Sequence, residues 1–352
     1  MLMLSSSKKE RVVIEIGTGR TKVVVGRNLG QKRKSGRMND VIRIRNAFSV
    51  DTPGIQDQTV EEGFTSEAGK SFQPVFDDRK LQNLLTDEFR NRGIKADKVI
   101  VTVTHGSVIS REMVIPKADD EKLRSMIRYE FEEFLPIDAD RYLIDYKILE
   151  ETREGTVDKY KLMVAALPKE EGTFYHNFVQ NLGKDPFALD ITSNVVSKLF
   201  DRNMKVNGKV REIEEKTFAY VDIGKSSIEL NIIEKGVLKF TRMVEGGMKS
   251  LNNNAESERS QSEKTEEQLQ RWVNSLEQMF KFYTSRETNR EIDQIFLFGG
   301  GSDIPSIDRY MNEVIDIPVE VIKEIENVEL HKKCESCTLA EYVNAVASLI
   351  RR

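Results

Sequence analysis

Residues 13–22 read VIEIGTGRTK, a β-rich run that is broken by the turn GTGR at residues 17–20 and then resumes. Branched apolar residues on both sides of a short turn of small residues are typical of a β-hairpin. The same organisation returns about 200 residues later, where residues 218–223 and 228–233 flank the turn GKSS at 224–227. Two copies this far apart predict two similar subdomains, because the period of a solenoid repeat would be shorter.

Turns of Gly, Ser and Thr can place backbone N–H groups and hydroxyls against a phosphate, since no large side chain blocks the approach. Two such hairpins facing each other would hold a polyphosphate from both sides. A third motif follows: the strand-like residues 294–298 run into GGGS at 299–302, before a helical pattern over 306–314. Glycines at this point leave space for a flat base or ribose beside the helix N-terminus. The order of the three motifs is more informative than any one of them.

Other stretches predict the elements around these motifs. Residues 121–135 carry apolar side chains at helical spacing, and Pro136 ends that helix. Residues 252–268 are the most polar segment and precede a clear amphipathic pattern from Leu269 to Tyr283. The remaining predicted elements are strands at 41–45, 98–103, 142–149 and 160–167 and helices at 81–90 and 338–352.

Composition narrows the class of protein. The 352 residues are 39% hydrophobic and 32% charged, and the net charge is −4. A chain of this size can form about two domains, and its charge balance lacks the basic excess typical of nucleic-acid-binding proteins. No apolar run reaches the ~18 residues needed to cross a bilayer, and residues 1–4 precede lysines in the opposite order to a secretory signal. We therefore expect a cytoplasmic protein that binds no nucleic acid.

The three motifs carry a family resemblance. Residues 13–22, 220–227 and 296–302 resemble the first phosphate loop, the second phosphate loop and the adenosine motif of the actin, Hsp70 and sugar kinase superfamily. Residues 108–116 and 127–149 narrow this resemblance to the PilM-type assembly proteins of bacterial type IV pilus systems, with FtsA as the nearest alternative. The resemblance implies an α/β, actin-like (ribonuclease H-like) two-lobed fold with an inserted FtsA/PilM-type extra subdomain.

The resemblance also implies boundaries along the chain. The expected parts are a first lobe with the first phosphate loop (11–95), the inserted extra subdomain (96–170), a connecting helix of the first lobe (186–210), a second lobe with a short helical part at 251–290 (217–330), and a final helix that returns to the first lobe (338–352).

By the same resemblance, ATP and Mg²⁺ are the expected cofactors. Glu15 and Asp222 would hold Mg²⁺ through water, and Asp190 is the one candidate for a catalytic role. The residues that would face phosphate from the first loop are Gly17, Thr18, Gly19, Thr21 and Lys22. Those from the second loop are Gly224, Lys225, Ser226 and Ser227, and those lining the adenosine are Gly299, Gly300, Gly301 and Ser302.

Three departures from the family pattern bear on activity. Glu15 stands where the family carries Asp, and Lys225 replaces a small residue, so its stem either pairs with phosphate or obstructs the cleft. The segment between Gly247 and Leu269 is short, and residues 255–259 (AESER) are only a fragment of the Ala-Glu-x-x-Lys stretch that relatives place against the base. These departures predict weak or absent ATP hydrolysis.

The resemblance implies a cytoplasmic scaffold of type IV pilus assembly. It would dock the N-terminal tail of a PilN-type inner-membrane protein in a groove beside the extra subdomain, and ATP would modulate the docking. Pilus motor ATPases are further expected partners, and the partner would hold the scaffold at the inner face of the membrane. Arg111 and the helix at 121–135 are candidate groove residues, although fold packing explains them equally well.

Two other functions stay open. An ATP-hydrolysing actin-like or sugar-kinase-like enzyme would need a catalytic base, for which Asp190 is the only candidate. An FtsA-like filament-forming division protein would be favoured by a C-terminal amphipathic membrane helix, and residues 338–352 predict only a core helix.

Cys334 and Cys337 form a Cys-x-x-Cys pair near His331. Together they offer three zinc ligands, whereas a structural zinc site takes four. A redox pair would lack its usual thioredoxin-like setting. The favoured interpretation is an ordinary loop with two thiols.

Overall fold

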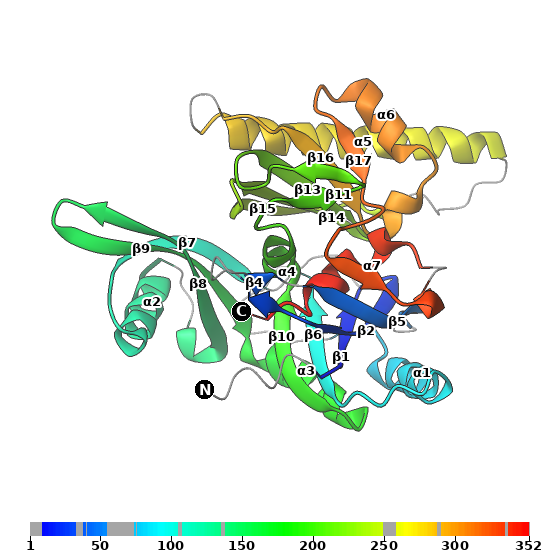
Figure 1. The fold of residues 1–352 in the computed structure, drawn as a ribbon, viewed down its shortest axis with the longest axis horizontal. Helices are drawn as coiled ribbons and strands as arrows, with labels where there is room; N and C mark the ends of the chain where they lie inside the picture. Colours follow the sequence, from blue (N-terminus) through cyan, green and yellow to red (C-terminus); the bar gives the residue numbers. More distant parts are fainter. Residues whose placement is uncertain are drawn as a thin grey trace. The chain divides into compact units, whose positions relative to one another are not determined.

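The computed structural model describes residues 9–32, 38–39, 41–54, 74, 76–104, 108–134, 138–248, 258–286, 290–334 and 337–351. The chain forms two compact units (Figure 1). Unit 1 comprises Met1–Gly54, Phe76–Thr104 and Lys184–Arg352, and unit 2 comprises Ile55–Val75 and His105–Gly183.

Unit 1 contains two large sheets. The first has the strand order β10-β6-β1-β2-β5-β18, and the second has the order β15-β14-β13-β16-β17. The strands of the first sheet are β1 (Arg11–Ile16), β2 (Arg20–Asn28), β5 (Ile42–Asp51), β6 (Lys98–Val103), β10 (Asp185–Ile191) and β18 (Val328–Leu330). The strands of the second sheet are β13 (Thr217–Ile223), β14 (Ser227–Glu234), β15 (Val237–Glu245), β16 (Gln294–Phe298) and β17 (Val319–Val321).

The two sheets share one topology. Each is built on a central antiparallel hairpin, β1–β2 or β13–β14. A third strand pairs antiparallel with the second strand of the hairpin, as β5 does with β2 and β15 with β14. On the other side β6 runs parallel to β1, and β16 runs parallel to β13. The repeat seen in the hairpin sequences therefore extends over most of each sheet.

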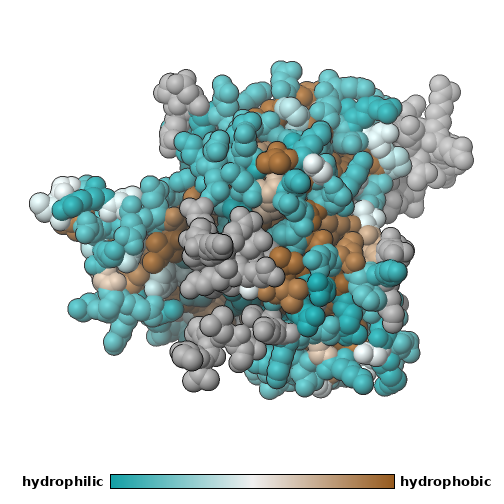
Figure 2. All heavy atoms as spheres, viewed as in Figure 1, coloured by the Kyte–Doolittle hydropathy of each residue, from teal (hydrophilic) through white to brown (hydrophobic). Residues whose placement is uncertain are grey.

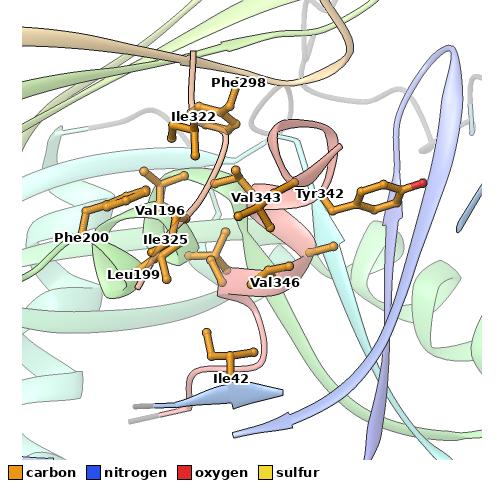
Figure 3. Close-up of a cluster of buried hydrophobic side chains, with 14 of the residues drawn as sticks. Ile42, Val196, Leu199, Phe200, Phe298, Ile322, Ile325, Tyr342, Val343 and Val346 are labelled. Atoms are coloured by element: carbon orange, nitrogen blue, oxygen red, sulfur yellow. The ribbon is translucent and has the colours of Figure 1, made fainter. Parts of the chain in front are cut away.

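Helices complete the layers of unit 1. Helices α4 (Thr192–Leu199) and α7 (Leu339–Ala347) lie between the two sheets, and α5 (Glu258–Thr284) and α6 (Ile307–Val314) cover the outer face of the second sheet (Figure 1). Helix α1 (Asp78–Asn91) packs its Phe89 ring edge-on against Phe48 of β5. The core between the sheets, shown in Figure 3, includes Ile42, Val196, Leu199, Phe200, Phe298, Ile322, Ile325, Tyr342, Val343 and Val346.

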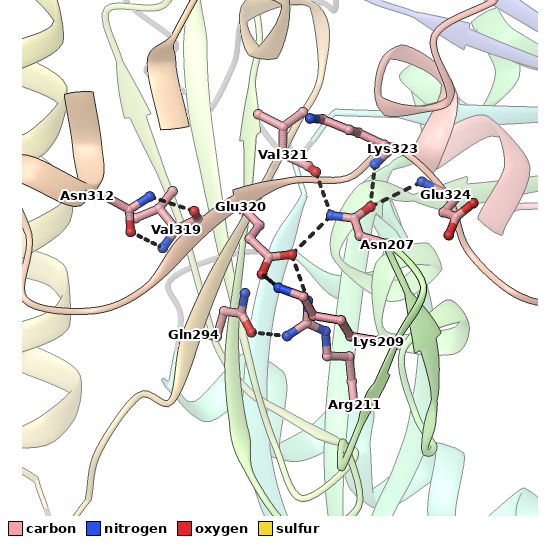
Figure 4. A network of polar contacts seen from close by, with 10 residues as sticks. All are labelled: Asn207, Lys209, Arg211, Gln294, Asn312, Val319, Glu320, Val321, Lys323 and Glu324. Carbon is pink, nitrogen blue, oxygen red and sulfur yellow. Dashed lines mark hydrogen bonds and ion pairs between the residues drawn. The ribbon is translucent and has the colours of Figure 1, made fainter. Parts of the chain in front are cut away.

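A small hairpin, β11 (Met204–Val206) and β12 (Lys209–Arg211), connects α4 to the second sheet. Figure 4 shows how polar contacts fix it: the Asn207 amide donates to the carbonyl of Val321 at 2.8 Å, and Arg211 pairs with Glu320 of β17 at 2.7 Å. Burial raises the pKa of Glu320, but hydrogen bonds from Asn207, Arg211 and Lys209 outweigh it and lower that pKa to about 2. The link between the two sheets is thus pinned to the edge of the second sheet.

In its described residues, unit 2 forms a three-stranded antiparallel sheet with two α-helices. The strand order is β7-β9-β8, with β7 (Ile109–Pro116), β8 (Tyr142–Glu154) and β9 (Val157–Pro168). Helix α2 (Asp120–Phe134) buries Leu123, Ile127 and Phe131 against one face, because its apolar residues recur at helical spacing. Helix α3 (Lys169–Asn181) contacts β8 and β9. Two further short strands of the chain, β3 (Gln31–Lys32) and β4 (Met38–Asn39), pair with each other.

Several elements differ from the sequence-based outline. Strand β6 begins at Lys98, inside the range expected for the inserted subdomain, yet it pairs with β1 in unit 1. The connecting helix expected within 186–210 is α4, and strand β10 precedes it. Helix α3 was not anticipated. Pro136 and residues 252–257 lie outside the described residues. Within the described part of the chain, no helix is both long enough and apolar enough to span a membrane.

Candidate functional site

Strand alternation brings the charged residues of the two hairpins to one layer. Successive residues of a strand face opposite sides of the sheet. Val13 and Tyr220 belong to the core between the sheets, so Glu15 on β1 and Asp222 on β13 face the same layer two residues further on. Their register partners are Lys22 on β2 and Glu229 on β14. Two acid-bearing hairpin ends therefore meet in the layer that holds α4 and α7.

The two hairpin turns have the same backbone bond. The Gly17 amide donates to the Arg20 carbonyl at 3.2 Å, and the Gly224 amide donates to the Ser227 carbonyl at 2.9 Å. A Cβ added to Gly17 or Gly224 would stand 2.9 or 3.0 Å from that same carbonyl oxygen. Each turn therefore needs glycine at its first position.

The turns also touch each other. The Thr18 and Ser226 hydroxyl oxygens are 2.8 Å apart, within hydrogen-bond distance. The Lys225 stem lies against Gly19, where an added Cβ would stand 2.3 Å from Cδ of the lysine. The sequence left two roles for Lys225, pairing with phosphate or obstructing the cleft. In this structure its stem lies across the first turn, as the second role requires.

A buried polar cluster lies beneath the turns. Lys22 Nζ donates to Glu15 Oε1 at 3.0 Å, and the Asn344 side-chain amide of α7 bridges Glu15 Oε1 at 3.3 Å and Asp222 Oδ2 at 2.7 Å. Glu15 is 4% exposed and Asn344 2% exposed. Glu15 Oε2 and Asn344 Oδ1 are buried acceptors with no hydrogen-bond donor among the described residues. The cluster thus retains unused acceptor oxygens.

Glu229 extends this cluster. It accepts hydrogen bonds from the hydroxyl of Thr192, at the start of α4, and from the Asn231 amide at 3.0 Å. Burial raises the pKa of Glu229, and the charge of Glu15 raises it further against those two hydrogen bonds. Burial likewise raises the pKa of Asp222 to about 7, although Lys22 opposes the shift. The second hairpin therefore holds two acids whose pKa values are raised, whereas the first holds an ion pair.

The glycine motif, residues 299–302, packs directly against β13 of the second hairpin. Gly299 has φ +85°, a left-handed conformation that favours glycine, and an added Cβ would lie 2.0 Å from Asp222 Oδ1. Its amide donates to the Ala340 carbonyl of α7 at 2.9 Å. Gly301 packs on Ile223, and the Ser302 hydroxyl donates back to the Gly299 carbonyl at 2.7 Å. A Cβ on Gly300 would meet nothing within 4 Å.

Asp190 lies in a separate set of contacts. At the end of β10 it accepts from Lys198, from Arg351 at 2.8 Å and from the Asn194 amide at 2.7 Å. The carboxylate is 5% exposed and is paired with two cations. These contacts tie β10 to α4 and to the end of the chain, and none of them involves a residue of the two turns. Its expected catalytic role stays a prediction.

Most of the predicted site residues lie together in the two turns and the polar cluster. Several residues that the sequence analysis did not predict lie there too. Thr21 is held through Thr52, whose hydroxyl lies 2.9 Å from that of Thr21 and 2.7 Å from the Gly17 carbonyl. The other missed residues are Thr192, Glu229, Asn231 and Asn344. The signal for Glu229 and Asn231 was available, because polar residues interrupt the apolar side of a buried strand.

A hollow lies beside the second hairpin. Its volume is about 540 Å³, within the usual range for small-molecule pockets. The Gln268 amide at its wall donates to the Gly246 carbonyl at 2.8 Å. The lining residues are Ile228, Val244, Gly246, Gln268, Arg271, Trp272, Asn274 and Ser275.

The polar cluster suits a hydrated cation better than a directly bound one. Among the described residues, no group of three or more His, Cys, Asp or Glu side chains is arranged to hold a metal ion. Mg²⁺ usually keeps several waters and contacts few carboxylates. The unpartnered oxygens of Glu15 and Asn344, beside Asp222, are acceptors of the kind that such waters need. The residues present therefore fit Mg²⁺ held through water.

Comparison with known proteins places the fold. A family model described as Type IV pilus assembly protein PilM matches residues 73–348. No curated protein matches the chain. Among solved structures, a chain of the PilM-PilN type IV pilus biogenesis complex has a TM-score of 0.70 at 16% sequence identity, over 97% of this chain and 98% of that chain.

Two more distant structures are also similar. A Bacteroides thetaiotaomicron protein with an actin-like ATPase fold has a TM-score of 0.45 at 13% identity, over 100% of both chains. The ethanolamine utilization protein EutJ from Carboxydothermus hydrogenoformans has a TM-score of 0.46 at 10% identity, over 97% of this chain and 89% of that chain. The likeness to a chain of the PilM-PilN complex shows a shared fold, and the mixed sheets and helices agree with the predicted α/β class. Since the family model covers most of its length, the chain belongs to the type IV pilus assembly protein PilM family.

Proposed function

We propose that this chain is a scaffold of type IV pilus assembly that binds the N-terminal cytoplasmic tail of a PilN-type inner-membrane protein on unit 2, with ATP bound in unit 1 as a modulator. The observation that carries the proposal is the family match, together with the fold shared with a chain of a PilM-PilN complex. On this proposal the scaffold works in the cytoplasm, and its partner holds it at the membrane. Motor ATPases of the pilus would be further partners.

Unit 2 offers an apolar surface for the tail. The residues of β7 that face α2 are Met113 and Ile115, so Val114 between them faces the opposite side of the sheet. Val114 is 55% exposed. By the strand register, Met163 and Ala165 of β9 lie on this same side. We name Val114, Met163 and Ala165 the outer strip. Figure 2 shows apolar side chains breaking the hydrophilic surface of this unit.

The outer strip has features of a peptide-binding surface. The ion pair between Lys161 and Glu112, 2.9 Å long, lies on the same side and supplies one charge of each sign. Helix α3 borders the strip, because its Gly172 packs on Leu143 of β8. An extended peptide could place apolar side chains on the strip while the charged pair fixes its register.

Arg111 is less suited to docking. It faces the α2 side of the sheet, and its guanidinium lies 4.1 Å from the centre of the Phe134 ring. That stacking is worth about 1 kcal/mol in exposed settings and stabilises the end of α2. Arg111 therefore supports the packing of unit 2, and Tyr129 on α2, which is 68% exposed, provides a control site on that side.

Fluorescence anisotropy with a labelled peptide tests the docking surface. The peptide is the N-terminal cytoplasmic segment of the PilN-type protein of the same organism. Val114→Asp places a charge in the outer strip and should weaken binding by at least about tenfold. Tyr129→Asp adds the same charge on the α2 side and should change it by less than about twofold. Equal affinities for the two variants would show that the outer strip is not the docking surface.

The polar cluster of unit 1 supports the ATP part of the proposal. Lys22 and the two turns would face the phosphates, and Glu15 and Asp222 would hold Mg²⁺ through water. The bound cation would screen the phosphates, while the turn amides and hydroxyls fix their position. Because Lys225 and the contact between Thr18 and Ser226 close the turns on each other, the turns have to separate for a polyphosphate to enter.

Isothermal titration calorimetry of Mg-ATP into the purified chain tests this part. Binding in the micromolar range, abolished by Asp222→Ala, is the expected result. Asp145→Ala in unit 2 is the control, since Asp145 is exposed and lies outside the polar cluster of unit 1, and it should leave ATP binding unchanged. No heat at millimolar ATP would contradict nucleotide binding and leave a scaffold whose docking is independent of ATP.

A further inference from the structure

We propose that Cys334 and Cys337 are a redox-active dithiol that converts reversibly to an intramolecular disulfide. The two residues are the only cysteines of the chain. Both thiols are free in the structure, Cys334 fully buried and Cys337 partly exposed. The scaffold and nucleotide functions proposed above make no use of either.

A backbone hydrogen bond joins the two cysteines. The Cys337 amide donates to the Cys334 carbonyl at 3.0 Å, and the Cys334 amide donates to the His331 carbonyl at 2.7 Å. A turn closed by such a bond brings its first and last Cα atoms to within about 7 Å. Disulfides span Cα separations of roughly 4.4–6.8 Å. The Cα separation of the pair is therefore compatible with a disulfide.

The side chains point to a common place as well. The Cys337 thiol donates to the Ala47 carbonyl of β5 at 3.2 Å. Burial raises the pKa of the Cys334 thiol, and a hydrogen bond from the Ala47 backbone opposes that shift. Both thiols therefore lie beside the backbone of Ala47. The nearby Arg92 guanidinium lowers the pKa of each thiol, although burial outweighs it.

The difference in exposure assigns the order of the reaction. The Cys337 thiolate attacks one sulfur of a small-molecule disulfide such as oxidised glutathione, which releases one glutathione and leaves a mixed disulfide. Cys334 then loses its proton and attacks the Cys337 sulfur, which releases the second glutathione. The protein pair loses two electrons and two protons, and the glutathione disulfide gains them. Because both thiol pKa values are raised, the exchange is slow at neutral pH and faster in mild base.

Incubation of the native chain with oxidised glutathione, followed by mass spectrometry and thiol labelling, tests the proposal. The wild type should lose two hydrogens, retain no labelled thiol and recover both with dithiothreitol. The Cys334→Ser variant should stop at the mixed disulfide on Cys337. The Cys337→Ser variant should keep its buried Cys334 unmodified, and circular dichroism checks that both variants fold.

Three outcomes would overturn the proposal. One is a wild type that accumulates glutathione on Cys337 without closing the bridge. Another is a bridge between two chains. The third is a native protein that stays reduced under conditions in which the chain unfolded in guanidinium oxidises, which would make the pair two inert loop thiols.

Discussion

The hairpins β1–β2 and β13–β14 have the same turn, the same register and the same topological neighbours, yet they carry different charges. In the first, Glu15 faces Lys22 across the strands, and an ion pair results. In the second, Asp222 faces Glu229, so two acids lie opposite each other across the strands. The two hairpins thus share a backbone structure but differ in their charges: one has an acid opposite a base, and the other has two acids opposite each other. Equivalent positions of the two hairpins therefore contribute different charges to the polar cluster.

Removal of the one cation in the cluster should have the largest effect. Lys22→Met leaves Glu15 buried beside Asp222, with the Asn344 amide as its remaining side-chain donor among the described residues. Loss of one partner of a buried ion pair costs about 3–5 kcal/mol. Urea unfolding followed by circular dichroism measures this change in the free energy of unfolding.

Glu229→Gln on the other hairpin is the matched control. It removes a charge that has no cation opposite and keeps an acceptor for Thr192. We expect a change within about 1 kcal/mol of the wild type. Equal losses in the two variants would mean that the hairpins do not differ in charge pairing.

The second-largest expected difference between the hairpins is in the pH dependence of the free energy of unfolding. The pKa of Asp222 is raised to about 7 in the folded chain, against a usual value of 3.8. Between these values the folded state binds more protons, so the free energy of unfolding falls as pH rises, by up to ~1.4 kcal/mol per pH unit. Asp222→Asn should lack this component. A wild-type minus variant difference that stays constant from about pH 4 to pH 7 would contradict the assignment.

Substitution of either turn glycine by alanine should lower the stability by a similar amount. Gly17→Ala and Gly224→Ala each bring a Cβ to 2.9 and 3.0 Å from the carbonyl oxygen of the turn bond. We expect each to cost ~1–2 kcal/mol and the two costs to agree within ~0.5 kcal/mol. Thermal unfolding measured side by side provides the comparison, and clearly unequal costs would show that the two turns are not equivalent.

The contact between the turns should have the smallest effect. The Thr18 and Ser226 hydroxyls make a solvent-exposed hydrogen bond. Thr18→Val and Ser226→Ala should each cost ~0.5 kcal/mol, and the double variant should cost little more than either. A double-mutant cycle on the free energy of unfolding measures this coupling, and full additivity would rule the bond out.

Local patterns were enough to predict most elements and the three glycine motifs. Strands β6 and β16 occupy the predicted ranges 98–103 and 294–298. Their short apolar runs are bounded by polar or glycine residues, which mark strand ends within one sequence window. The hairpins were likewise visible from apolar runs around a turn of small residues, and α2 from its helical period.

The polar cluster needed contacts that no local window contains. Asn344 reaches Glu15 and Asp222 from the other end of the chain. Helix α7 is buried on all sides, so no amphipathic period marks the side that faces the cluster. Asp190 looked available in the sequence because its cation partners stand 8 and 161 residues away. Pairing between residues this far apart in the sequence can be recognised only once the fold is known.

The discontinuity of the first sheet has a consequence for the order of folding. All strands of the second sheet fall between residues 217 and 321, so that sheet can assemble from one continuous segment. The first sheet combines strands from residue 11 to residue 330, and its edge strand β18 is the last of these strands to be synthesised. Pairings between distant segments close slowly because of the loop entropy they require. We therefore expect the second sheet to gain protection from hydrogen exchange first during refolding, with the first sheet forming around it.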